Sequence, residues 1–226
     1  MVAMPPDPDR VDPRPADPRR AEVVRLLERY LIEVVERWNL CPWAKSAREG
    51  GEVAIEVVWG TPTAAALGVV AAGLLARPGT AVAMVVVPEL AVSPRELREL
   101  RAAVAPAVPH AGVADFHPEA PLDLGTPARL VPFVRRSPDP LLQFVPFALM
   151  KNVRAPTPVV DLTFQAQLLG GLDLPVLRED VGDLIAEDNH RAVSAALAEV
   201  TAVLADIARD RASAYARVGI SSSRSP

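Results

Sequence analysis

Three short apolar segments, separated by stretches with helix start signals, constrain the fold of this chain most. The segments EVAIEVVW (Glu52–Trp59), TAVAMVVV (Thr80–Val87) and GVADFH (Gly112–His117) are short and rich in apolar and β-branched residues, as strands are. The connections between them are long enough for the helical crossovers that join parallel strands. The sequence therefore predicts an α/β fold with a small, mainly parallel β-α-β-α-β sheet flanked by helices.

The helices are indicated by capping residues. Thr61-Pro62 places a capping side chain before a proline, and Ser93–Glu96 has the pattern of a capping box. Asp17-Pro18 predicts an N-terminal amphipathic helix that continues to about Trp38. A long C-terminal helix is expected over Asp183–Val218.

The remaining segments complete the predicted organisation. Leu130–Val134 is a candidate fourth strand, Pro140–Met150 a helix, and Lys151–Pro158 a stretch too rich in proline for regular structure. Residues 1–20 contain six prolines and are expected to form a disordered leader. Residues 21–218 are then one α/β domain, and 219–226 a flexible tail.

Composition narrows the class of protein. The 24 basic and 28 acidic residues give a net charge of −4, which argues against a dedicated nucleic-acid binder. No apolar run approaches the roughly 20 residues of a membrane span, so a soluble, cytoplasmic protein without a membrane partner is expected. The single cysteine excludes an intramolecular disulfide and a cysteine-rich zinc site.

Cys41 is the first candidate for chemistry. Pro42 is placed to begin a short helix, with Cys41 as its N-cap, and Lys45 and Arg48 follow closely. The helix dipole and both cations would lower the pKa of the thiol. The alternative is that Cys41 is a small buried hydrophobic residue.

His117 and the segment Arg135–Pro140 are the other candidates. His117 ends the third predicted strand, where open parallel sheets bind ligands, although such a histidine can also simply hydrogen-bond a loop. Ser137 would cap the next helix, and Arg136 before it suits a carboxylate or phosphate. The alternative is an ordinary cap with solvent-facing arginines, and Asp139 would compete with an anion for the same donors.

Four motifs in this order resemble the bacterial family known as domain of unknown function 1415, over about residues 22–200. They are NLCPWA (Asn39–Ala44), FHP (Phe116–Pro118), RSPDP (Arg136–Pro140) and IAEDN (Ile185–Asn189). That family has no established activity, so the resemblance implies a constellation of site residues rather than a reaction. The constellation is Asn39, Cys41, His117, Arg136, Ser137 and Asn189.

The chain also departs from the family pattern. Asp139 stands where members usually have an aromatic residue, and Gln143 stands where they usually have a histidine. Extra length lies around Arg154–Arg178. These departures are compatible with a specialised offshoot that has its own substrate.

Three hypotheses of function follow. In the first, the protein is a small-molecule enzyme in which Cys41 is the nucleophile, His117 the base or acid, and Arg136 with Ser137 an anion-binding helix start. In the second, Cys41 or His117 ligates haem or a metal, although no recognised ligand spacing signals one. In the third, the chain is a non-catalytic module that binds a ligand or a protein. The sequence predicts neither the substrate nor the oligomeric state.

Overall fold

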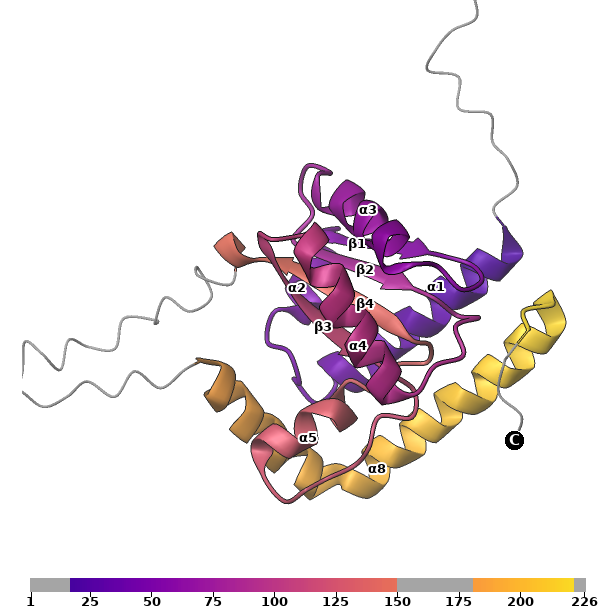
Figure 1. The fold of residues 1–226 in the computed structure, drawn as a ribbon. Coiled ribbons are helices and arrows are strands. Elements are labelled where there is room, and N and C mark those ends of the chain that lie inside the picture. The colour runs from indigo at the N-terminus through magenta and orange to yellow at the C-terminus, as the bar shows by residue number, and fades with distance from the viewer. Residues whose placement is uncertain (1–16, 150–180, 222–226) are drawn as a thin grey trace, which may run out of the picture.

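The computed structural model describes residues 17–149 and 181–221, and it is built around one four-stranded sheet (Figure 1). The strands are β1 (Val53–Val57), β2 (Val82–Val86), β3 (Ala111–Phe116) and β4 (Leu141–Pro146). The α/β class is confirmed, and the first three strands lie within two residues of their predicted ends.

The prediction of a mainly parallel sheet is confirmed only in part. The strand order is β1-β2-β4-β3, and only β1 and β2 run parallel. β4 lies antiparallel between β2 and β3, with Phe144 opposite both Ala83 and Val113. A strand from later in the chain therefore occupies the position beside β2 that the predicted β-α-β-α-β unit would give to β3.

Local signals place most helices correctly. Asp17 accepts a hydrogen bond from the N–H of Arg19, and Ser93 and Glu96 form the predicted capping box. The cap before the third helix is Thr63 rather than the predicted Thr61. The helices are α1 (Pro18–Tyr30), the π-helix η1 (Leu31–Glu36), α2 (Ala44–Glu49), α3 (Ala64–Leu75), α4 (Pro94–Val104), the 3-10 turn η2 (Ala105–Ala107), α5 (Pro127–Val134) and α8 (Val181–Val218).

Two predicted elements are wrong in type. The candidate strand Leu130–Val134 is part of α5, because the Thr126 hydroxyl caps the helix and Pro127 occupies its first position. The predicted helix Pro140–Met150 begins instead as the strand β4. Its backbone pairs with two neighbouring strands that are distant in sequence, and this pairing outweighs the local helix start signal.

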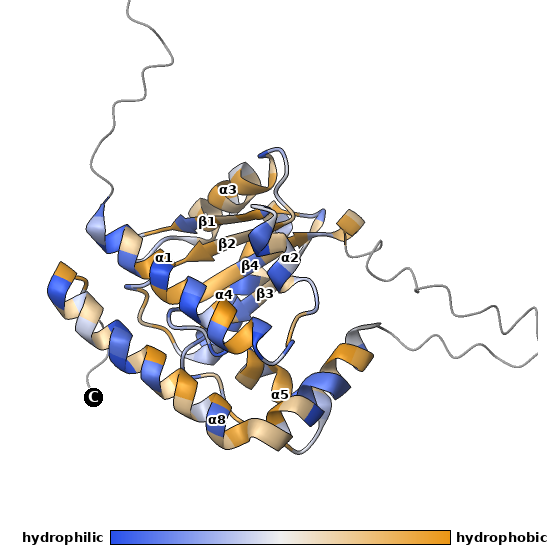
Figure 2. Cartoon of the chain, turned by 180° about the vertical axis from the view of Figure 1, so that it is seen from behind, coloured by the Kyte–Doolittle hydropathy of each residue, from blue (hydrophilic) through white to orange (hydrophobic). Residues whose placement is uncertain are grey.

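Helices cover both faces of the sheet. α3 and α4 pack on one face, whereas α1 lies on the other, with α8 packed against α1 and α5 (Figures 1 and 2). β2 contributes to both cores: Met84 and Val86 face α1, while Ala83 and Val85 face α3 and α4. This strand is therefore buried on both faces.

α8 confirms the predicted long C-terminal helix and closes the α1 side of the core. Its buried residues Val193, Val200, Ile207 and Ala214 recur every seven residues, and the helix kinks at Ala196. On its partly exposed side, Asp210 pairs with two arginines of α1, and these bonds lower the pKa of Asp210 to about 2.

Some predictions concern residues outside the described part of the chain. These are residues 1–16 of the predicted leader (1–20), the irregular stretch Lys151–Pro158, the extra length around Arg154–Arg178 and residues 222–226 of the predicted tail (219–226). Residues 18–20 of the predicted leader are instead the start of α1. No helix within 17–149 and 181–221 has the length and apolar character that crossing a bilayer requires.

Candidate functional site

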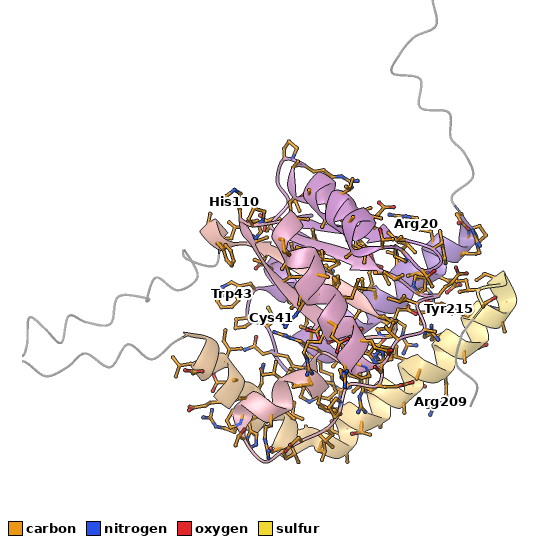
Figure 3. All side chains as sticks on the ribbon, viewed as in Figure 1. Arg20, Cys41, Trp43, His110, Arg209 and Tyr215 are labelled. Atoms are coloured by element: carbon orange, nitrogen blue, oxygen red, sulfur yellow. The ribbon has the colours of Figure 1, made fainter. Side chains whose placement is uncertain are left out.

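Cys41 lies in the turn between η1 and α2, not at the helix N-cap. The cap of α2 is Trp43, two residues later than predicted, and the Cys41 carbonyl accepts a hydrogen bond from the N–H of Ala44 at 3.1 Å. Cys41 and Trp43 lie on the same side of the molecule as His110, away from Tyr215 on α8 (Figure 3). The preceding π-helix is a type of segment that is frequent at functional sites.

Burial raises the pKa of the Cys41 thiol, which contradicts the predicted activation. The N–H groups of Trp43 and Ala44 favour the thiolate, but the loss of solvent outweighs them. The charge of Arg48 is already paired, because its Nε lies 2.6 Å from an oxygen of Glu36. Cys41 is therefore not the helix cap, Arg48 is neutralised by Glu36, and packing against the core disfavours the thiolate.

Alkylation of Cys41 by iodoacetamide is expected to be slow at neutral pH, with an apparent pKa above the ordinary thiol value. The physical reason is that the reactive thiolate is disfavoured where the side chain is shielded from water. Because the chain has one cysteine, the rate against pH by mass spectrometry reports this group alone. The denatured chain is the control, and a native apparent pKa below that of the control would contradict the expectation.

His117 lies at the end of β3, as predicted, but both of its ring nitrogens are engaged by the backbone. Nδ1 accepts the N–H of Glu119 at 2.9 Å, so Nε2 carries the proton and donates to the Val92 carbonyl at 2.8 Å. The residue is 3% exposed. This arrangement matches the structural alternative, a histidine that ties loops together, and leaves neither nitrogen available to take a proton from Cys41.

The predicted anion-binding helix start at Arg136 and Ser137 is absent, because a strand and not a helix follows. The Arg136 guanidinium donates to the Ala120 carbonyl and lies over the ring of Phe133. The buried Ser137 hydroxyl donates to the carbonyl of Asp139. Both side chains stabilise the turn before β4, so neither forms the predicted site.

Asn39 and Asn189 both help to fix the conformation of the loop that carries Cys41. Asn39 has a φ of 51°, in the left-handed region that asparagine tolerates after a helix end. The buried Asn189 donates from Nδ2 to the Leu40 carbonyl at 3.0 Å and so joins α8 to this loop. The structure thus places two members of the predicted constellation beside Cys41. Both fix the conformation of its loop, and neither presents an exposed group to a ligand.

Arg135, which the sequence did not distinguish from Arg136, is the candidate whose charge no carboxylate of the described residues pairs directly. Its guanidinium lies 5.7 Å from the ring centroid of Phe116, and burial lowers its pKa. Tyr30 donates its hydroxyl to the carbonyl of Val134, the residue before Arg135, and Cys41 and Phe116 pack against the core that contains Tyr30. The charges of Arg135 and of a Cys41 thiolate both act on the pKa of this phenol. We refer to Tyr30, Cys41, Phe116 and Arg135 as the Arg135 site.

The other candidates are a surface groove and a possible metal site. A shallow, mainly apolar groove of about 520 Å³ runs between β1 and α3, from Trp59 past Val69 to Arg77. Within the described residues, no three histidine, cysteine or acidic side chains come together to hold a metal ion. Ligation of haem or a metal by Cys41 stays a prediction, and the ring nitrogens of His117 already have partners.

Comparison with protein-family models, with curated proteins and with solved structures gives no match. The resemblance to the domain of unknown function 1415 family therefore stays a prediction from the motifs.

Proposed function

We propose that this protein binds a small anionic molecule at the Arg135 site. The observation that carries this proposal is a half-buried guanidinium whose charge no carboxylate of the described residues pairs directly. A partly desolvated cation is costly to a protein unless something compensates it. Several other shielded arginines do have such partners: Arg29 with Glu33, Arg48 with Glu36 and Arg211 with Asp139.

The surrounding charges support an anion rather than a cation as ligand. Asp115 favours the charged form of Arg135, but this carboxylate already lies 3.3 Å from Nε of Arg101. Two guanidinium groups thus share one carboxylate, which leaves positive charge in excess. A guanidinium presents a planar set of donors that matches a carboxylate or phosphate, and the Phe116 ring offers an apolar surface beside it.

The test is anion binding by the full chain with and without this guanidinium. We expect calorimetric titration at constant ionic strength to detect binding of at least one of inorganic phosphate, glycerol phosphate, succinate and malate. Arg135→Met keeps the apolar stem and removes the charge. It is expected to weaken that binding about ten- to a hundredfold, the range of a lost charged hydrogen bond.

Arg129→Met is the matched control, because Arg129 lies on α5, the helix that ends directly before Arg135, and its side chain is 67% exposed. Its affinity for the same anions should equal that of the wild type. Absence of binding by the wild type, or unchanged binding by Arg135→Met, would contradict the proposal.

Thiol chemistry on the bound anion is the second candidate function. It is favoured by the position of Cys41, whose thiolate and Arg135 both act on the pKa of Tyr30. An anion held by Arg135 would then lie near the thiol. Slower alkylation of Cys41 in the presence of the bound anion, but not in Arg135→Met, would support this candidate, and equal rates would contradict it.

A further inference from the structure

Gln143 occupies an unusual position for an amide. It lies in the interior strand β4, directly between Met84 of β2 and Ala114 of β3. Because side chains alternate along a strand, Gln143 shares the face of Leu141, which packs in the α1 and α8 core. Its neighbours on this face, Met84, Ala114 and Leu141, are apolar, so a polar side chain is unusual at this position.

The Gln143 amide has no hydrogen-bond partner in the described part of the chain. The side chain is half-buried, and its polar atoms are not sealed from solvent. An amide that is open to solvent can be hydrated, so it carries little desolvation cost and is accessible to a ligand. No contact with the described residues explains why this strand carries glutamine.

Gln143 is adjacent to the Arg135 site. Phe116 is paired with Leu141, and Gln143 is paired with Ala114, so Gln143 and Phe116 are diagonal neighbours on one face. Diagonal neighbours across antiparallel strands lie roughly 7–8 Å apart, within reach of long side chains. Arg135 approaches the same ring at 5.7 Å. Phe116 thus has an unpartnered amide and an unpaired guanidinium as neighbours.

We propose that Gln143 determines the specificity of the Arg135 site, an inference that rests on the proposed anion binding. Its amide hydrogen-bonds a neutral polar group of the ligand, while Arg135 holds the anionic group and the carbon skeleton covers Phe116. The ligand class is accordingly a small carboxylate or phosphate ester that also carries a hydroxyl, carbonyl or amide group.

The experiment uses Gln143→Met, which has nearly the same shape but neither donor nor acceptor. The probes are two pairs that differ by hydroxylation: malate with succinate, and glycerol phosphate with propyl phosphate. We expect the wild type to prefer the hydroxylated member by about three- to tenfold, the value of one neutral hydrogen bond. Gln143→Met should lose this preference, retain binding of the other member, and melt at the same temperature as the wild type or higher.

The outcomes separate this inference from the proposed function. Binding that depends on Arg135 but shows no preference for hydroxylated probes overturns the role of Gln143 alone. A preference that survives in Gln143→Met, or a melting temperature that falls because the amide has a protein partner, also overturns it. If the wild type binds inorganic phosphate but none of these four probes, only the role of Gln143 is overturned. Failure of the wild type to bind inorganic phosphate as well overturns both proposals.

Discussion

Replacing Arg211 with alanine is expected to lower the free energy of unfolding by about 3–5 kcal/mol, the range for one partner of a buried ion pair. Arg211 on α8 lies 2.7 Å from Oδ1 of Asp139, and its side chain is 8% exposed. Tyr215 donates its hydroxyl to the other oxygen, and the Arg211 guanidinium also reaches the Pro88 carbonyl. Without Arg211, the buried carboxylate of Asp139 would keep the tyrosine hydroxyl but lose the positive charge that Arg211 supplies.

Chemical denaturation measures this loss. Arg209→Ala is the matched control, since this arginine lies on the same helix, is 72% exposed and pairs with Asp206 at the surface. Its effect should stay within about 1 kcal/mol. A combined Arg211→Met and Asp139→Asn variant should recover part of the stability, because it removes both charges together. A loss in Arg211→Ala no larger than in the control would contradict the importance of this pair.

Replacing His117 with leucine is expected to lower the free energy of unfolding by about 1–3 kcal/mol, because two part-buried hydrogen bonds worth about 0.5–1.5 kcal/mol each are lost. The backbone partners are the N–H of Glu119 and the carbonyl of Val92, which the imidazole joins across the end of β3. If His117 were instead a catalytic base, the substitution would abolish activity and leave stability nearly unchanged.

The control for this variant is His110→Leu, because His110 is exposed. Its free energy of unfolding should change by no more than about 0.5 kcal/mol, as expected of a surface position. Both variants are compared by urea denaturation of the full chain. Equal stability of the two variants would show that the backbone bonds of His117 are dispensable.

Much of the fold was predictable because its signals are local. The capping box at Ser93 and the β-branched run of β2 each depend on neighbouring residues, and both were identified correctly. β4 was predicted as a helix because Ser137 and the prolines around it imitate a helix start. Only its pairing with β2 and β3 shows that this segment is an interior strand.

The candidate site was predictable in part. The sequence identified the Cys41 loop and the end of β3, and the structure places Asn189 against the first of them. It could not distinguish Arg135 from Arg136, because adjacent arginines have the same local context. The carbonyl that occupies Arg136 and the ring that faces Arg135 come from other parts of the chain.

The sequence by itself determined most of the helices, three of the four strands and the α/β class, since capping and periodicity act over a few residues. Tertiary structure alone decided the strand order, the protonation preference of Cys41 and the partners of each buried charge. These properties depend on groups that are far apart in the chain, such as Asp139 and Arg211, separated by 72 positions. Burial and charge compensation arise only when such groups meet, and they distinguish a structural side chain from one available to a ligand.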